Sequence, residues 1–154
     1  MECPQPHTIL AAVDESENSR RAVNYLSRWV ACYEEAEVVL THVVKEPSED
    51  VLPDQDEREV YLAERREAGQ ALLTKCRERL ERHGVPSERL AHNLLTCVPP
   101  DTIVEAILQE MENGDYDTIV LGRRGMSKKE EYIFGSVTNR LVREIEDSSV
   151  WVVP

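Results

Sequence analysis

The stretch TILAAVD, residues 8–14, decides the fold of this chain. A short, β-branched and almost wholly apolar run is typical of a strand buried on both faces of a parallel sheet. The run ends at Asp14, and a helix is predicted directly after it, with Ser16 as its N-cap. A buried strand that leads into a helix indicates an α/β protein.

The same alternation continues along the chain. Further strands are predicted over residues 38–44, 90–98, 117–121 and 149–153. The segments between them carry apolar stripes at helical spacing: Ala22, Leu26, Trp29, Val30 and Tyr33; Ala68, Leu72, Cys76 and Leu80; Ile103, Ile107 and Met111; and Val137, Leu141 and Ile145. Strict alternation predicts a parallel sheet with helices on both faces, in a single domain spanning residues 1–154.

Helix boundaries are predicted from capping residues. A long, charged helix is expected over residues 58–83 and ends at Gly84, a C-cap that precedes Val85-Pro86. The stretch before it, residues 46–59, holds two prolines and seven carboxylates against one arginine, which predicts a solvated loop. Asp101 is predicted as the N-cap of the next helix.

Composition excludes several classes of protein. Thirty acidic residues stand against 18 basic ones, a formal net charge of −12, which disfavours nucleic-acid binding. The chain has no apolar run near the roughly 20 residues that span a bilayer. Its N-terminus lacks a basic segment followed by a long apolar one, so we expect no signal peptide, no membrane partner and a cytoplasmic location.

The four cysteines, Cys3, Cys32, Cys76 and Cys97, lack the close spacing of zinc or redox motifs. Their even number leaves disulfides open in principle, but a reducing cytosol favours free thiols. We expect the last three to be small core or boundary residues rather than metal ligands or redox groups.

The segment from Gly122 to Thr138 contains three of the six glycines. Gly122 follows a predicted strand, and Gly135-Ser136 precedes a predicted helix. Glycine lets the backbone approach a ligand closely, and the free N–H groups at a helix N-terminus suit a phosphate. The hydroxyl groups of Ser136 and Thr138 could add further donors. The spacing is neither a Walker A motif nor a dinucleotide fingerprint. The alternative is a connector that only turns the chain.

The segment matches the pattern G-x2-G-x9-G-[ST] and so resembles the ATP-binding members of the universal stress protein family. The first strand with its closing Asp14, the run Thr41-His42-Val43-Val44 and the final strand over residues 149–153 resemble that family as well. The resemblance implies an open five-stranded parallel sheet in the order 3-2-1-4-5, a Rossmann-like fold of the adenine nucleotide alpha hydrolase-like type.

The resemblance also implies a site for ATP, or for AMP or ADP, with Mg²⁺ or Mn²⁺ bridging the phosphates. Asp14 would lie at the adenosine end, and Val43 would meet adenine through its backbone. The phosphates and ribose would be surrounded by Gly122, Gly125, Gly135, Ser136 and Val137. Because Mg²⁺ commonly relies on substrate phosphates, the lack of an acidic cage is no objection.

Each of these residues has a plainer interpretation. Asp14 could cap the helix that follows it, and Val43 could be an ordinary core residue of a strand. Ser136 could be a simple N-cap, although capping and phosphate binding use the same geometry.

The charges of the glycine segment point both ways. Arg123 and Arg124 could reach phosphate oxygens or be solvated. The lysines at 128–129 add local positive charge, which favours an anion, and the glutamates at 130–131 offset it. A mobile, mixed-charge loop is the alternative.

No reaction chemistry stands out. His7, His42, His83 and His92 form no visible catalytic arrangement, and His42, in a buried strand, is expected to be a satisfied core histidine. We therefore expect a regulatory, nucleotide-sensing protein of the stress response with at most weak ATPase activity. A slow ATP hydrolase or nucleotidyl-transfer enzyme and a nucleotide-free scaffold are the alternatives.

The last strand, residues 149–153, ends the chain and is expected at a sheet edge. Trp151 is predicted to face away from Val150 and Val152, because side chains alternate along a strand. An uncovered apolar edge invites pairing, and members of the family commonly dimerise through this strand, so we predict a homodimer. An edge covered by the N-terminal segment or by a loop is the alternative.

Overall fold

Five parallel strands form one sheet in the order β3-β2-β1-β4-β5 in the computed structural model, which describes residues 7–123 and 134–154. The strands are β1 (His7–Ala12), β2 (Ala36–Lys45), β3 (Leu90–Cys97), β4 (Thr118–Gly122) and β5 (Ser149–Val153). The helices are α1 (Glu17–Cys32), α2 (Gln55–Arg82), α3 (Ile103–Asn113) and α4 (Ser136–Glu144), and a short 3-10 helix, η1, spans Ser87–Arg89. The predicted α/β class and strand order are confirmed.

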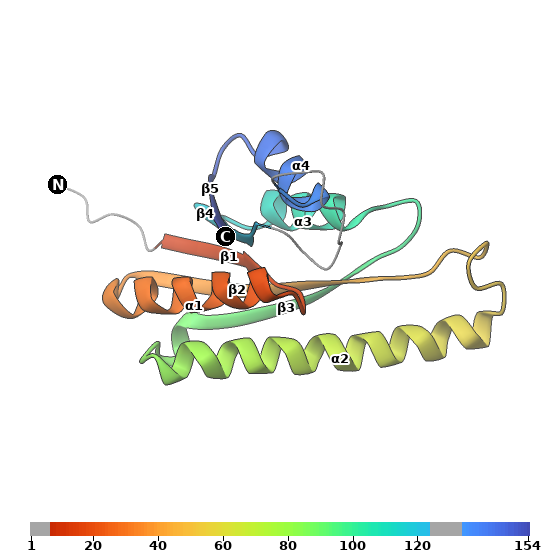
Figure 1. Ribbon diagram of the computed structural model, residues 1–154, viewed down its shortest axis with the longest axis horizontal. Helices are drawn as coiled ribbons and strands as arrows, with labels where there is room; N and C mark the ends of the chain where they lie inside the picture. The colour runs from red at the N-terminus through yellow and green to blue at the C-terminus, as the bar shows by residue number, and fades with distance from the viewer. Residues whose placement is uncertain (1–6, 124–133) are drawn as a thin grey trace.

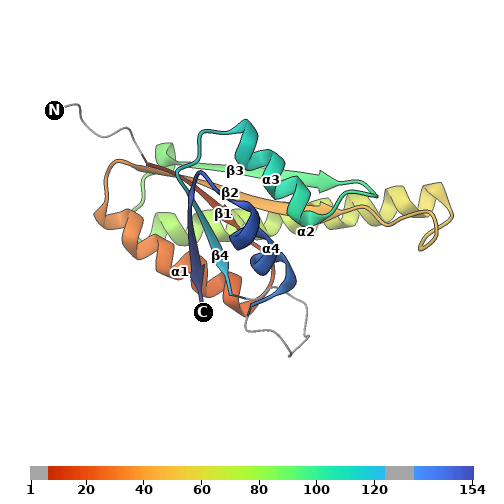
Figure 2. The ribbon, with the colours of Figure 1, turned by 90° about the horizontal axis from the view of Figure 1, so that it is seen from above.

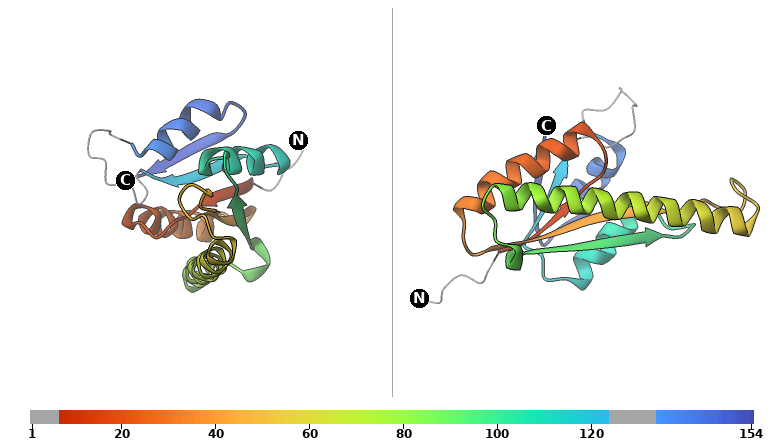
Figure 3. Two further views of the ribbon diagram at one scale, coloured as in Figure 1. Left: turned by 90° about the vertical axis from the view of Figure 1, so that its right-hand side faces the viewer. Right: turned by 90° about the horizontal axis from the view of Figure 1, so that it is seen from below.

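The helices cover the sheet in two pairs, α1 with α2 on one face and α3 with α4 on the other (Figures 1 and 3). The chain first winds outward from β1 to β3, then crosses to β4 and continues to β5, and right-handed crossovers place the two pairs on opposite faces. Within β1, Ile9 and Ala11 belong to the core under α1 and α2, whereas Leu10 and Ala12 face α3 and α4. Strand order therefore reverses between β1 and β4.

Helix α1 follows the prediction. Ser16 is its N-cap, and its Oγ accepts a hydrogen bond from the Ser19 N–H at 3.1 Å. Trp29 of α1 packs edge-to-face on Trp151 of β5, with ring centroids 4.9 Å apart. Val150 belongs to the core on the opposite face, so the predicted alternation along β5 is confirmed.

Helix α2 begins earlier than predicted. Asp54 is its N-cap and accepts a hydrogen bond from the Glu57 N–H at 2.9 Å, so the loop that follows β2 covers residues 46–54 only. The acidic run that looked like loop supplies the cap and first turn of the helix, where carboxylates are favourable. The C-cap is His83, one residue before the predicted Gly84, and Gly84 follows it with a φ of +90°, the conformation that glycine commonly adopts just after a helix C-cap.

The predicted stripe of α2 is wrong at Ala68, which is exposed. Leu80 is buried as predicted, and Leu72 and Cys76 are partly buried. The fully buried residues are Gly69, Leu73 and Leu80. A Cβ at Gly69 would lie 2.8 Å from both His42 Cδ2 and Leu94 Cδ1, so this side of α2 approaches the sheet too closely for any larger residue. The N-terminal end of α2 extends past the sheet, where no buried stripe is needed (Figure 2).

The prediction of Asp101 as the N-cap of α3 is wrong by one residue. Thr102 is the cap, and its Oγ1 accepts from the Glu105 N–H while the Glu105 carboxylate accepts from the Thr102 N–H. This reciprocal capping box satisfies two helix N-terminal donors at once. Its signature, Thr-x-x-Glu, is present in the sequence and outweighs a lone aspartate.

Cys32, Cys76 and Cys97 are free thiols, whereas Cys3 lies outside the described residues. Cys97 is buried, and burial raises the pKa of the half-buried Cys76 thiol to about 11. Cys32 is exposed at the end of α1, so the core or boundary placement is wrong for it. None of the described helices is both long and apolar enough to cross a membrane.

Candidate functional site

A cavity of about 430 Å³ opens where β1, β2 and β4 end, bounded by α1, α3 and α4. Its volume lies in the range of about 300–1,000 Å³ that is usual for small-molecule sites. It adjoins the reversal of strand order between β1 and β4, which is where open parallel sheets bind ligands. Six residues predicted for the site line it: Asp14, Val43, Gly122, Gly135, Ser136 and Val137. Gly125 lies outside the described residues.

One side of the cavity is apolar. Its lining comes from the sheet and from one face of α3, and consists of Ala12, Val43, Ile103, Ile107 and Leu121. The ends of three strands and one helix thus enclose a slot with few polar atoms. Such a slot suits a flat, weakly polar group such as a nucleobase.

The backbone of Val43 is open toward this slot. The pairing of β1 with β2 ends at Ala12 and Thr41, but β2 continues to Lys45. The Thr41 carbonyl faces β1, where it accepts from the Val13 N–H at 2.8 Å. Since the direction of backbone groups alternates along a strand, Val43 directs its N–H and C=O to the same side, beyond the end of β1.

Asp14 lies at the polar mouth of the cavity, half-buried. Its Oδ1 accepts from the Ser16 N–H at 2.9 Å, and its own N–H donates to Ser19 Oγ at 2.9 Å. The cap of α1 is Ser16, so the plainer interpretation of Asp14 as the cap is wrong. One carboxylate oxygen thus shapes the turn into α1, while the residue as a whole lines the cavity.

Helix α4 presents its N-terminus to the cavity. Gly135 is the N-cap and Ser136 the first helical residue, and no side chain among residues 7–123 and 134–154 caps this end of the helix. The N–H groups of the first turn have no acceptor within the helix. A helix N-terminus whose first N–H groups lack an acceptor is suited to binding an anion.

Gly122 is required by a close approach, since a Cβ there would lie 2.7 Å from the backbone carbon of Asn18 and 2.8 Å from Ser19 N. The Thr138 hydroxyl, predicted as a further phosphate donor, instead donates to the Gly122 carbonyl at 2.9 Å. It is buried and joins α4 to the end of β4. The sequence marked Gly122 and the Thr138 hydroxyl as groups for a ligand. It did not predict that Gly122 lies against α1 or that Thr138 of α4 bonds to the Gly122 carbonyl.

Arg123 does not line the cavity. Its N–H donates to the Val153 carbonyl at 2.7 Å, and its carbonyl accepts from the Gly135 N–H at 2.9 Å, so its backbone joins β5 to the start of α4. Within the described part of the chain its Nε is buried and has no hydrogen-bond partner. Arg124 and residues 128–131 lie outside the described residues.

Sequence reasoning missed Thr41 as a cavity residue. It is buried in β2, lines the cavity, and its Oγ1 has no hydrogen-bond partner among residues 7–123 and 134–154. A threonine directly after the apolar run Val38–Leu40 was the available signal. A buried hydroxyl without a partner is destabilising by about 1–3 kcal/mol, so such a group at a cavity wall is a candidate ligand contact.

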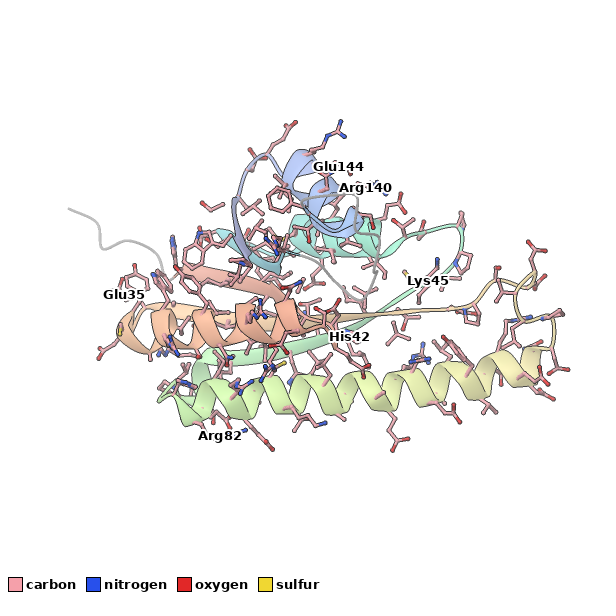
Figure 4. The ribbon with its side chains drawn as sticks, in the orientation of Figure 1. Glu35, His42, Lys45, Arg82, Arg140 and Glu144 are labelled. Atoms are coloured by element: carbon pink, nitrogen blue, oxygen red, sulfur yellow. The ribbon has the colours of Figure 1, made fainter. Side chains whose placement is uncertain are left out.

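His42 lies beside the cavity, but its imidazole points to the other face of the sheet. Its ring packs against Gly69 of α2, and its Nδ1 lies 2.7 Å from the Val13 carbonyl, which identifies Nδ1 as the donor (Figure 4). The expectation of a satisfied core histidine is confirmed for this ring. Asp14 is the one charged side chain in the cavity lining, as far as the described residues go.

Helices α3 and α4 are joined outside the cavity by charged side chains. Arg140 contacts Glu144 at 3.0 Å and Glu105 at 3.8 Å, on the outer face of α4 (Figure 4). Hydrogen bonds from Thr102, together with Arg140, lower the pKa of Glu105. Exposed ion pairs of this kind contribute at most about 1 kcal/mol each, so they orient the two helices rather than stabilise the fold. Over the described ranges, no cluster of metal-binding side chains is found.

Comparison with known proteins agrees with this geometry. The model of the universal stress protein family matches residues 6–154. The universal stress protein UspA from Lactobacillus plantarum has a TM-score of 0.79 at 19% identity, over 99% of this chain and 100% of that one. A universal stress protein in complex with cAMP has a TM-score of 0.65 at 21% identity, over 96% and 97%. One from Archaeoglobus fulgidus in complex with dAMP has a TM-score of 0.60 at 17% identity, over 96% and 98%. No curated protein matched.

Proposed function

The chain belongs to the universal stress protein family, and on that basis we propose that its cavity binds an adenine nucleotide. The nucleotide is ATP, or AMP or ADP, and the protein acts as a regulatory nucleotide sensor of the stress response in the cytoplasm. The observation that carries this proposal is the division of one cavity into an apolar slot and an uncapped helix N-terminus. A base and a phosphate need these two environments at opposite ends of one site.

The slot supports adenine as the base. The Val43 N–H and C=O are open to a ligand, and the edge of adenine carries the complementary donor and acceptor. The ligands of two structural neighbours, cAMP and dAMP, both contain adenine. Asp14 is placed to accept a ribose hydroxyl or an adenine amino hydrogen with the oxygen that Ser16 does not use.

The α4 end supports the phosphates. The Ser136 hydroxyl and the first N–H groups of α4 supply donors beside Gly122 and Gly135. A Mg²⁺ or Mn²⁺ ion held by phosphate oxygens needs few protein ligands, and Asp14 is the anionic side chain that the described lining offers.

Binding rather than turnover is the proposed activity. A hydrolase needs a base within about 3 Å of an attacking water, and the ring of His42, the histidine at this cavity, lies on the other face of the sheet. Steady-state phosphate release from ATP tests this. We expect weak activity at most, and rapid multiple turnover would contradict the proposal.

Ligand identification tests the binding itself. Mass spectrometry of the freshly purified and then denatured protein should release an adenine nucleotide, and calorimetry with ATP, ADP and AMP, each with and without Mg²⁺, should rank them. An absence of both co-purified and added nucleotide binding would instead support the nucleotide-free scaffold.

Variants of two aspartates test whether the nucleotide binds in the cavity. Replacing Asp14 by Asn should weaken ATP binding about tenfold, because a charge-assisted hydrogen bond is lost. Asp101→Asn is the matched control, since Asp101 is exposed after β3 and does not line the cavity. Equal losses for both variants would place the nucleotide elsewhere.

We propose a homodimer formed by the outer edge of β5. Ser149 and Val153 hydrogen-bond toward β4, so the residues between them, Val150 and Val152, direct their backbone N–H and C=O groups outward. Within the described residues β5 is an edge strand whose outer side pairs with nothing. Unpaired edges of this kind are templates for pairing with a second chain.

Light scattering tests the dimer. The wild-type mass should be twice that of the 17.6 kDa chain. Val152→Pro removes one outward N–H without touching the β4 ladder and should give a monomer, whereas Val152→Ala keeps that N–H and should stay dimeric. A wild-type monomer at micromolar concentration would contradict the dimer but leave the nucleotide proposal standing.

A further inference from the structure

The N-terminal end of α2 extends beyond the sheet and forms a second surface (Figures 1 and 3). A shallow groove runs along it, lined by one side of the helix and by the preceding loop. We call this groove the α2 overhang, and its residues are Leu52, Asp56, Glu57, Val60, Tyr61 and Glu64. It shares no residue with the nucleotide cavity.

The α2 overhang exposes apolar side chains. Val60 is 60% exposed and Tyr61 37%, and the neighbouring Val51 in the loop is 74% exposed. Three of the seven large apolar side chains that are exposed in the described chain thus lie within eleven residues. Scattered exposed apolar residues are ordinary, but their concentration on one helix face marks an interaction surface.

Buried contacts hold the loop against the helix. The side chain of Arg58 is only 13% exposed and donates to the carbonyls of Leu52 at 2.7 Å and Pro53 at 2.9 Å. It also pairs with Glu49 at 3.5 Å. The Asp54 cap fixes the first turn of the helix from the same loop. The groove is therefore formed before any partner arrives, which lowers the entropy lost on binding.

Acidic side chains predominate around the groove, although the guanidinium of Arg65 lies over the Tyr61 ring, 5.1 Å from its centroid. Residues 46–64 carry eight carboxylates and a single cation, Arg58, which the loop carbonyls and Glu49 already occupy. Asp56, Glu57 and Glu64 stand directly beside Val60 and Tyr61. The surface therefore combines an apolar centre with an acidic rim, an arrangement that selects partners by charge complementarity.

We propose that the α2 overhang docks a basic amphipathic segment of a partner protein, with apolar side chains on one side and Lys or Arg on the other. The charge argues against other occupants. A second copy of this face would bring like charges together, and nucleic-acid phosphates and anionic lipid headgroups would be repelled. The side chains at 56, 57, 60, 61 and 64 follow helical spacing, which suits an amphipathic helix laid along the groove.

Nuclear magnetic resonance of the full isotope-labelled chain tests this proposal. The probe is a synthetic amphipathic helix with Leu on one face and Lys on the other, and its counterpart carries Glu in place of Lys. We expect the basic peptide to shift amide signals of residues 49–64 with saturable, salt-sensitive binding, and the acidic peptide to shift none. Signals spread over the whole surface, or equal binding of the two peptides, would overturn the proposal.

Matched variants separate the groove from the general acidity of the chain. Glu57→Lys should weaken the basic peptide about fivefold, whereas Glu78→Lys, the same charge change on the exposed C-terminal half of α2, should have little effect. Val60→Ser should weaken it about fivefold, whereas Val142→Ser, at an exposed valine of α4, should not. Equal losses within either pair would contradict docking at the groove. All four positions are exposed, so unfolding is not expected, and circular dichroism checks it.

Discussion

The N-termini of α1 and α4 meet at the candidate cavity, but their backbone donors differ in how the described side chains cap them. The N-terminus of α1 is closed by its own residues, because Ser16 Oγ accepts from Ser19 N and Asp14 Oδ1 accepts from Ser16 N. The N-terminus of α4 begins at Gly135, which has no side chain, and no side chain in the described part of the chain caps it. Both are attached to the same sheet, at the ends of β1 and near the end of β4.

This difference assigns the two helices different tasks. A capped N-terminus has satisfied part of its donors with its own side chains, whereas one without such a cap keeps all of them, with a partial positive charge, for a ligand. Capping strength and anion binding therefore compete for the same N–H groups. Substitutions that add a cap to α4 or remove the cap of α1 therefore test whether the two helices differ in this way.

The largest effect is expected from Gly135→Asp, which caps α4 as Ser16 caps α1. The φ of −62° and ψ of 158° at this position suit an aspartate N-cap. Its carboxylate would occupy the first N–H groups and repel phosphate, so ATP affinity should fall at least about 100-fold, roughly 2.7 kcal/mol. Calorimetry measures the loss.

The same variant should melt no lower than the wild type without nucleotide, because an N-cap stabilises a helix. Gly135→Ala is the control, since it adds bulk without a capping group and should keep more affinity than the aspartate. An aspartate variant that still binds ATP normally would remove α4 from the site.

Gly122→Ala tests the contact between the closed N-terminus and β4. The new Cβ would press on the backbone of Asn18 and Ser19, so the free energy of unfolding should fall by about 2 kcal/mol. Chemical denaturation measures it. Gly84→Ala cannot serve as the control, because Gly84 has a positive φ that alanine disfavours. Ala106→Gly in α3 serves instead, and its expected loss in unfolding free energy is about 1 kcal/mol. A stable Gly122→Ala variant would show that α1 can move away from β4.

Ser16→Ala opens the closed N-terminus. We expect a loss of about 1 kcal/mol in unfolding free energy from the missing cap, with little change in ATP affinity. Asp54→Ala removes the cap of α2, away from the cavity, and should lose a similar amount. A large affinity loss specific to Ser16→Ala would mean that α1 also binds the ligand.

The smallest effect is expected from Thr41→Val, which removes the unpartnered buried hydroxyl with little change of shape. Without nucleotide, the variant should be more stable by up to about 1 kcal/mol, because the polar atom no longer lacks a partner. Saturating nucleotide should shrink this gain if the ligand uses the hydroxyl. Thermal melts with and without ATP measure both, and a destabilised free variant would show that the hydroxyl has a partner in solution.

The parallel sheet could be predicted because buried parallel strands are short, apolar and separated by helices, as in residues 8–14, whereas the strand order came from the resemblance to the universal stress protein family. Capping signals were harder to rank. Asp54, Thr102 and Asp101 all have side chains that favour N-caps, but Asp54 and Thr102 are each followed three residues later by a glutamate, and Asp101 is not. The stripe of α2 was misplaced because sequence periodicity cannot show that Gly69 must lie against His42 and Leu94.

The candidate site could be predicted wherever a motif fixed the residue. The glycine pattern located Gly122, Gly135 and Ser136, and the strand end located Asp14. Thr41 could not be found this way, because its importance depends on a missing partner rather than on its own type. The side-chain placement of Arg123 likewise depends on packing that no local pattern encodes.

The backbone of Arg123 connects the proposed dimer edge with the proposed nucleotide site. Its N–H donates to the Val153 carbonyl of the edge strand, and its carbonyl accepts from the Gly135 N–H at the start of α4. A nucleotide that shifts this residue would shift the dimer edge too. By thermodynamic reciprocity, a ligand that tightens self-association is itself bound more tightly by the associated form. The nucleotide concentration at half-saturation would then depend on the protein concentration. Nucleotide occupancy would respond to the amount of the protein as well as to the amount of nucleotide.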